Sequence, residues 1–165
     1  MPITEIITGL LYLGSLEDAI SKIDMEKLNI KIIYNVAKEC RSEYFHLGIK
    51  VNNYPIIDSP KFKINPYIDR IIDDIHININ NRNPVFIHCR MGRSRSVAII
   101  LAYLIKYNNK TLLESLKYVK NQRNINPNTG FMSELVDFEY KLTKIKTIDP
   151  IEYRDYLKNN YIKKK

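Results

Sequence analysis

The chain contains 165 residues with a formal net charge of +8, and 45% of the residues are hydrophobic and 27% charged. These values indicate one globular domain with anionic partners. Only two cysteines occur, which excludes a disulfide framework, and no stretch reaches roughly 18 apolar residues, which excludes a membrane span. Residues 1–5 lack the basic and apolar parts of a secretory signal, so we expect an intracellular, reducing location, cytoplasmic or nuclear.

In the first third of the chain, short apolar runs that predict strands are separated by a segment with the periodicity of a helix. Residues 6–13 predict one strand closed by Gly14, and β-branched runs at 30–36 and 51–57 predict two buried strands. A helix is predicted to start at Ser15, with one face formed by Leu16, Ala19, Ile20 and Ile23.

The remainder reads mainly as helices around one further strand. Asn65 is predicted to cap a helix that has Pro66 at its first position and an apolar stripe formed by Ile68, Ile71, Ile72, Ile75 and Ile79. A buried strand is expected at residues 85–88. Thr111 begins a capping-box sequence, which predicts a helix that runs to about Arg123. The later helices are expected over residues 131–146 and, briefly, after Asp149.

The segment that follows the last strand carries the chemistry. The apolar run ends in His88 and Cys89, five residues separate Cys89 from Arg95, and residues 97–104 continue at helical spacing. Inward N–H groups of such a loop, together with the dipole of the following helix, bind phosphate and favour a thiolate. Since the planar fork of Arg95 could hold two phosphate oxygens, this order is typical of phosphoryl transfer through sulfur.

Three arginines crowd the loop, Arg90, Arg93 and Arg95, and no acidic residue occurs between positions 85 and 107. These cations would repel one another unless an anion binds among them, which a purely structural cysteine does not explain. The few cysteines and histidines lack the spacing of metal ligands. We therefore predict an anion site that uses neither a metal nor another cofactor.

The motif His88-Cys89-x5-Arg95-Ser96 resembles the signature of the cysteine-dependent protein phosphatases. The flanks resemble the dual-specificity branch of that superfamily: Leu11-Tyr12-Leu13-Gly14-Ser15, Asn35-Val36, Asp58 and Asn126-Pro127-Asn128-Thr129-Gly130-Phe131. The similarity spans residues 6–142 and implies an α/β fold with a central, mostly parallel sheet of about four or five strands flanked by helices. Arg90-Met91-Gly92 is similar to the cofilin-phosphatase (slingshot) subgroup, from which Arg93 departs.

The resemblance also implies roles for individual residues. Cys89 is the expected nucleophile, which forms a phosphocysteine intermediate, and Arg95 stabilises the transferred phosphoryl group. Asp58 is the expected proton donor to the leaving oxygen and then the base for the hydrolytic water. Ser96 is expected to donate a hydrogen bond to the departing sulfur. The remaining loop residues are expected to bind substrate: Arg90, Met91, Gly92, Arg93 and Ser94.

Plainer interpretations stay open for two of these residues. Asp58 could be an ordinary residue of an Asp-x-Pro turn, in which case Asp69 and Asp73 are the other candidate acids. Ser96 could be only a helix cap.

Other residues near the loop are expected to support it. His88, Asn35 and Asn128 are predicted to hold the loop rather than to contact substrate. Arg93 is predicted to lie at the rim, where it would attract a second acidic group of the substrate, or else to be merely solvated. Cys40 could form a disulfide with the nucleophile under oxidation, although a buried thiol at a strand end is the favoured interpretation.

The function that this resemblance implies is a protein phosphatase for phosphotyrosine and phosphoserine or phosphothreonine. The sequence has little room for the long insert that deepens the pocket of strictly tyrosine-specific relatives. A phosphoinositide or RNA 5′-triphosphate phosphatase of the same superfamily is the alternative, which Arg90 and Arg93 keep open. A catalytically inactive phosphate-binding module is disfavoured, because Cys89, Arg95 and Asp58 are all present.

The chain is expected to divide into a catalytic domain over residues 1–148 and a short helix with a basic tail over residues 149–165. The final Lys163-Lys164-Lys165 is most simply a solvated terminus, with contacts to anionic surfaces as the alternative. Phosphorylated proteins are the expected partners, and nucleic acid is not expected.

Overall fold

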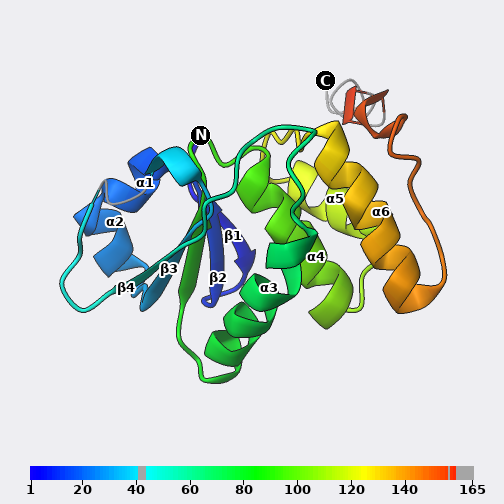
Figure 1. Cartoon of the computed structure of the whole chain (residues 1–165). Coiled ribbons are helices and arrows are strands. Elements are labelled where there is room, and N and C mark those ends of the chain that lie inside the picture. The colour runs from blue at the N-terminus through cyan, green and yellow to red at the C-terminus, as the bar shows by residue number, and fades with distance from the viewer. Residues whose placement is uncertain (41–43, 156, 159–165) are drawn as a thin grey trace.

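A computed structural model describes residues 1–40, 44–155 and 157–158 and shows a five-stranded sheet with helices on both faces (Figure 1). The strands lie in the order β1-β2-β5-β3-β4, and only β1 is antiparallel to its neighbour. Their bounds are Thr4–Ile7 for β1, Leu11–Gly14 for β2, Ile32–Asn35 for β3, Lys50–Asn53 for β4 and Val85–His88 for β5. The predicted α/β fold with a mostly parallel sheet is confirmed.

The register of the sheet positions the functional loop. The central strand β5 pairs with β2 and β3 so that His88 lies opposite both Gly14 and Asn35. The three strands therefore end at the same level, and the segments that follow them meet at one edge of the sheet. Open α/β sheets bind their ligands at this edge.

Alternation along the strands divides the core between the two faces of the sheet. Tyr12, Ile33 and Phe86 point to the face covered by α1 and α2, whereas their neighbours Leu13 and Ile87 point to the opposite face. The helices α1 (Leu16–Ile20) and α2 (Lys22–Lys27) cover the first face, and α3 (Asn65–Asn80), α4 (Arg95–Tyr107), α5 (Leu112–Lys120) and α6 (Thr129–Thr143) form the other layer (Figure 1).

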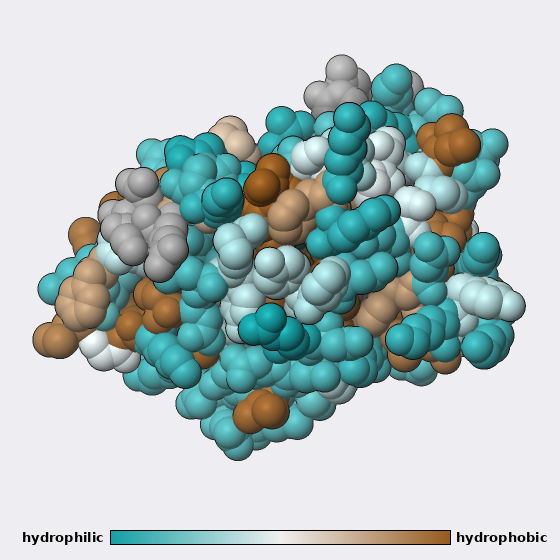
Figure 2. Space-filling view, in the orientation of Figure 1, coloured by the Kyte–Doolittle hydropathy of each residue, from teal (hydrophilic) through white to brown (hydrophobic). Residues whose placement is uncertain are grey.

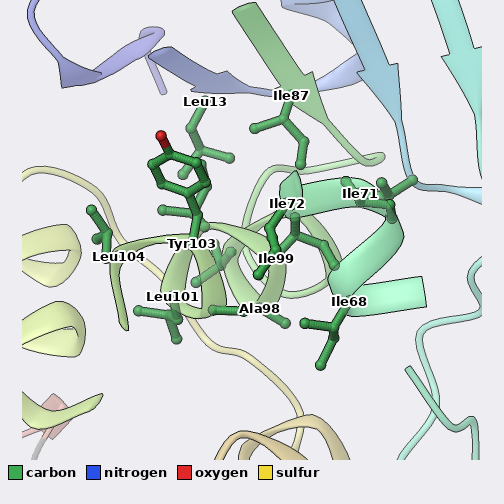
Figure 3. Packing of buried hydrophobic residues seen from close by; sticks show 14 of the residues in the cluster. Leu13, Ile68, Ile71, Ile72, Ile87, Ala98, Ile99, Leu101, Tyr103 and Leu104 are labelled. Atoms are coloured by element: carbon green, nitrogen blue, oxygen red, sulfur yellow. The ribbon is translucent and has the colours of Figure 1, made fainter. Parts of the chain in front are cut away.

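The helix that starts at the functional loop, α4, is the centre of the larger core. Every residue from Arg95 to Ile105 is buried, because α4 packs on β5 and is surrounded by α3, α5 and α6. Figure 3 shows Ile99 of α4 beside Ile72 of α3, while Leu101 points from the other side of α4, away from Leu13 and Ile87 of the sheet. A helix that is apolar all round is stable only when it is enclosed in this way. The loop before α4 is therefore attached to a helix that is buried over most of its length.

Two predicted elements at the start of the chain are wrong. Residues 6–13 do not form one strand, because a turn at Gly9, with φ of +73°, separates β1 from β2. The helix predicted from Ser15 is interrupted at Ser21, which ends α1 and caps α2. As a result Ile20 and Ile23 are exposed, at 47% and 78%, and do not share a buried face.

Two further corrections concern caps and strand length. Asn65 is the first residue of α3 rather than its cap, and the Glu134 carboxylate accepts hydrogen bonds from the N–H groups of Ile64 and Asn65. The strand predicted over residues 51–57 ends at Asn53, because its partner β3 ends at Asn35. The capping box at the start of α5 is present as predicted.

The chain after α6 returns to the end of the molecule that holds the functional loop (Figure 1). Residues 153–155 and 157–158 are helical, and Tyr153 and Leu157 are buried, with the Tyr153 hydroxyl donating to the carbonyl of Pro127. The predicted Lys163-Lys164-Lys165 tail lies outside the described residues. None of the helices in the described part is both long and apolar enough to cross a bilayer.

Candidate active site

Cys89 lies directly after β5 at the floor of the loop that runs to Arg95, which we call the phosphate loop (residues 89–95). Its side chain is only 2% exposed. The backbone N–H of Gly92 donates to Sγ at 3.3 Å, and the Ser96 hydroxyl lies 3.2 Å from Sγ. The Gly92 N–H is a hydrogen-bond donor to the sulfur, and the Ser96 hydroxyl lies close enough to donate a second hydrogen bond.

Gly92 is required for this turn of the backbone. Its φ is +68°, and a Cβ atom would lie 2.5 Å from the carbonyl oxygen of Gly14 and 2.4 Å from Nη2 of Arg123. Any side chain would therefore push the loop away from β2 and move the amide that contacts Cys89.

Arg95 begins α4 with a buried guanidinium that is held on one side by protein groups. Glu39 accepts two hydrogen bonds from it, one of them from Nη2 at 2.9 Å, and the carbonyl of Ile56 accepts from Nη1 at 3.0 Å. Burial alone would lower the pKa of Arg95, but the hydrogen bonds of Glu39 raise it above its ordinary value, and Arg95 in turn lowers the pKa of Glu39.

The Nε atom of Arg95 is buried and has no hydrogen-bond partner among the described residues. A buried donor without a partner is costly, typically by about 1–3 kcal/mol. A phosphate oxygen in the loop would satisfy this donor while Glu39 keeps the guanidinium in place. The orphaned Nε is thus a direct structural sign of an anion site.

Glu39 was missed in the sequence. It lies in the short 3-10 turn Lys38–Cys40, 56 residues before Arg95. The available signal was its position just after β3, since residues that follow neighbouring parallel strands converge at the same sheet edge.

Asp58 lies on the exposed loop after β4, close to the phosphate loop. Its Oδ1 atom accepts hydrogen bonds from the Ser94 hydroxyl at 2.8 Å and from the Asn128 side-chain amide at 2.9 Å. Ser94 Oγ also accepts from the N–H of Asn128 at 3.1 Å, and Asn128 caps α6 by accepting from Phe131. Two separate segments, the phosphate loop and the start of α6, therefore hold Asp58 beside the loop, and the Ser94 side chain is used for this support.

The other candidate acids lie elsewhere. Asp69 and Asp73 contact Lys106 at 3.1 and 2.9 Å, in the last turn of α4. That turn is about 16 Å along the helix axis from Arg95. Neither carboxylate lies near the nucleophile.

His88 is fully buried and lies between the phosphate loop and Tyr44. The sequence did not indicate a role for Tyr44. Nδ1 lies 2.9 Å from the carbonyl oxygen of Cys89 and Nε2 lies 2.7 Å from the Tyr44 hydroxyl. Burial lowers the pKa of His88 to about 4, so the ring is neutral at physiological pH. Because a carbonyl can only accept, Nδ1 carries the proton and Nε2 accepts from Tyr44.

Asn35 supports a different part of the site from the one expected. Its side-chain Nδ2 donates to Oδ1 of Asn53 at 2.8 Å, and its side-chain Oδ1 accepts from the N–H of Ala37 at 3.0 Å. These bonds fix the turn that leads to Glu39 rather than the phosphate loop itself. Arg123 does hold the loop: it is buried and donates to the carbonyls of Gly92 and Met91. Sequence reasoning did not find Arg123.

The two cysteines differ in their surroundings. Both are free and buried, and burial raises the pKa of Cys40, which keeps that thiol protonated. The pairing of Cys40 with Cys89 under oxidation stays a prediction.

A buried cysteine in an arginine-bearing loop, at the carboxyl end of a central parallel strand, defines a cysteine-dependent phosphatase-like domain. Residues 11–141 match the family described as dual specificity phosphatase, catalytic domain. The chain belongs to this family, as its motifs indicated.

Individual relatives agree with the family assignment. The chain is 37% identical over 134 residues to dual specificity protein phosphatase 1-A of Xenopus laevis, covering 81% of this chain and 36% of that protein. It is 31% identical to dual specificity protein phosphatase 18 of Rattus norvegicus, covering 82% and 67%. The crystal structure of human DUSP28 superposes with a TM-score of 0.80 at 23% identity, covering 86% of this chain and 95% of that one, and shows the shared fold. The chain spans about a third of the length of the first curated relatives that it matches.

Proposed function

We propose that this chain is a protein phosphatase that hydrolyses phosphotyrosine and phosphoserine or phosphothreonine through a phosphocysteine intermediate. The observation that carries the proposal is the orphaned, buried Nε of Arg95, which begins the helix after a loop whose amide contacts Cys89 Sγ. We assign residues 1–148 to the catalytic domain and residues 149–165 to a C-terminal short helix and basic tail. A cytoplasmic or nuclear location would keep the thiol reduced.

In the first step the Cys89 thiolate attacks phosphorus, so that an S–P bond forms as the ester P–O bond breaks. The loop amides and Arg95 bind the three equatorial oxygens and stabilise their charge. Asp58 protonates the leaving oxygen, and the hydrogen bonds from Ser94 and Asn128 hold its carboxyl group by one oxygen. The product is an alcohol or phenol and a phosphocysteine.

In the second step Asp58, now a carboxylate, accepts a proton from a water molecule that attacks phosphorus. The S–P bond breaks, the electron pair returns to sulfur and inorganic phosphate is released. The Ser96 hydroxyl, 3.2 Å from Sγ, donates to the departing thiolate. Asp58 thus carries out both proton transfers, first as an acid and then as a base.

The test is a substrate panel with wild-type protein and Cys89→Ser. Phosphotyrosine and phosphothreonine peptides, phosphoinositides and 5′-triphosphate RNA are compared by kcat/KM, with thiol alkylation as a second arm. We expect turnover of the peptides, lost on alkylation and in Cys89→Ser. Turnover of only the lipid or the RNA would transfer the assignment to that alternative, and no turnover of any substrate would support an inactive binding module.

A further inference from the structure

Beside the phosphate loop lies a hollow of about 710 Å³ with four cationic residues in its lining, which we call the basic hollow: Arg93, Lys120, Arg154 and Lys158. The other described residues that line it are uncharged, among them Ile125 and Leu157. Cations gathered in this way repel one another and produce a strongly positive local potential. The hollow is therefore complementary to an anionic group.

Arg93 belongs to both the phosphate loop and the basic hollow. It lies four positions after Cys89, and its backbone carbonyl accepts from Asn126 at 2.8 Å, which ties the loop to the wall of the hollow. Its Nε atom is buried without a hydrogen-bond partner among the described residues. Arg93 has no salt-bridge partner among the described residues, so its charge adds to the positive potential of the hollow.

Two of the four cations come from outside the matched catalytic domain, which ends at residue 141. Buried Tyr153 fastens this segment through its hydroxyl to Pro127, and Leu157 is also buried. These anchors hold Arg154 and Lys158 over the hollow, and Figure 1 shows the segment beside the start of α6. The described residues offer no salt-bridge partner to either side chain.

We propose that the basic hollow binds a second anionic group of the substrate, and that the substrate is an acidic phosphopeptide. This inference rests on the proposed function: one phosphorylated residue enters the phosphate loop while a carboxylate or phosphate on a neighbouring residue contacts Arg93, Arg154 and Lys158. The apolar residues in the lining, Ile125 and Leu157, are buried, so the hollow offers mainly polar and charged groups, which suits a carboxylate or phosphate of a peptide. The face in Figure 2 is also mostly hydrophilic, with small, separated hydrophobic patches.

The experiment compares two phosphotyrosine peptides that differ only in their flanks, glutamate in one and glutamine in the other. The variant Arg154→Gln/Lys158→Gln removes two charges from the hollow. The control variant Lys27→Gln/Lys31→Gln removes two exposed charges on the α2 side of the sheet. Hydrolysis of p-nitrophenyl phosphate by wild-type protein reports the proposed function separately.

We expect the wild type and the control to prefer the glutamate peptide by roughly two- to tenfold in kcat/KM at low salt, as two partly exposed ion pairs allow. The hollow variant should lose this preference, and raised salt should abolish it in the wild type. The charge-reversed variant Arg154→Glu/Lys158→Glu should prefer a lysine-flanked peptide, which a misfolded protein would not do.

Three outcomes overturn the inference. A hollow variant that loses activity equally on both peptides, or keeps the glutamate preference, shows that the hollow does not select substrate. A wild type that prefers phosphoinositide vesicles, with no preference between the peptides, shows a lipid site instead. Absent hydrolysis of p-nitrophenyl phosphate by the wild type refutes the proposed function itself, independently of the hollow.

Discussion

Arg93 and Arg95 belong to one loop, two positions apart, and have opposite surroundings. Arg95 is buried and held by Glu39, so its charge is compensated and its position is constrained. Arg93 is half-buried and lies among other cations. Under the functions proposed above, one loop would carry out two separate tasks. Its inner side, with Cys89 and Arg95, would act on every phosphate, and its outer side, with Arg93, would distinguish substrates.

The largest effect is expected on the inner side. Cys89→Ser should abolish turnover, because a serine hydroxyl is a far weaker nucleophile than the thiolate. Affinity for inorganic phosphate should remain, since the loop amides and Arg95 are unchanged, and calorimetry with phosphate measures it. Loss of phosphate binding together with turnover would mean that the substitution had collapsed the loop.

The next largest effect is expected from substitution of Asp58, which accepts a hydrogen bond from Ser94, the residue between the two arginines. Asp58→Ala should slow hydrolysis of alkyl phosphates by about 10²–10⁴-fold, the usual contribution of general acid catalysis. The deficit should shrink for aryl phosphates whose leaving groups need no proton. A series of aryl phosphates with graded leaving-group pKa measures this, and an equal deficit across the series would remove Asp58 from the acid role.

Beneath the inner side, His88 should make folding stability sensitive to pH. Burial lowers the pKa of His88 in the folded protein from 6.5 to about 4. Between these pH values the unfolded chain binds a proton that the folded protein does not bind. The free energy of unfolding therefore falls as the pH decreases from 6.5 to 4. The loss should be about 2–4 kcal/mol. Urea unfolding of the wild type and His88→Asn across this range should show a smaller pH-dependent loss in the variant, and parallel curves would contradict the assignment.

Glu39 tests whether the constraint on Arg95 matters for catalysis. Glu39→Gln keeps the shape but weakens the charge-assisted hydrogen bonds, and kcat should fall about tenfold with little change in KM. The pKa of Glu39 is lowered by Arg95, so its contribution to stability is present above its ordinary value and is lost as pH falls through the lowered value. The stability difference between wild type and variant should therefore narrow below about pH 4.5, and unfolding curves at several pH values measure this. A larger KM effect than kcat effect would assign Glu39 to binding instead.

The smallest effect is expected on the outer side. Arg93→Ala should reduce kcat/KM for acid-flanked phosphopeptides more than for small aryl phosphates, by about 0.5–1.5 kcal/mol for a partly exposed contact. The difference should fade as salt rises. An equal loss of kcat/KM on all substrates would show that Arg93 does not select substrates and so does not differ from Arg95 in this respect.

The sequence by itself determined the features that depend on neighbouring residues. The order of strand, phosphate loop and helix from Val85 to Leu104, and the capping box of Thr111 and Glu114, follow from hydrogen bonds and periodicities that close within one turn. The resemblance of these motifs to dual specificity phosphatases then led to the correct family and fold class.

Only the tertiary structure decided which distant residues meet. Glu39 reaches Arg95 across 56 positions, and Glu134 caps α3 from 70 positions away. The segment after α6 likewise brings Arg154 to the phosphate loop through the burial of Tyr153. Such pairs depend on how helices pack on the sheet, because a carboxylate or guanidinium finds its partner by proximity in space, and no short-range pattern in the chain encodes that proximity.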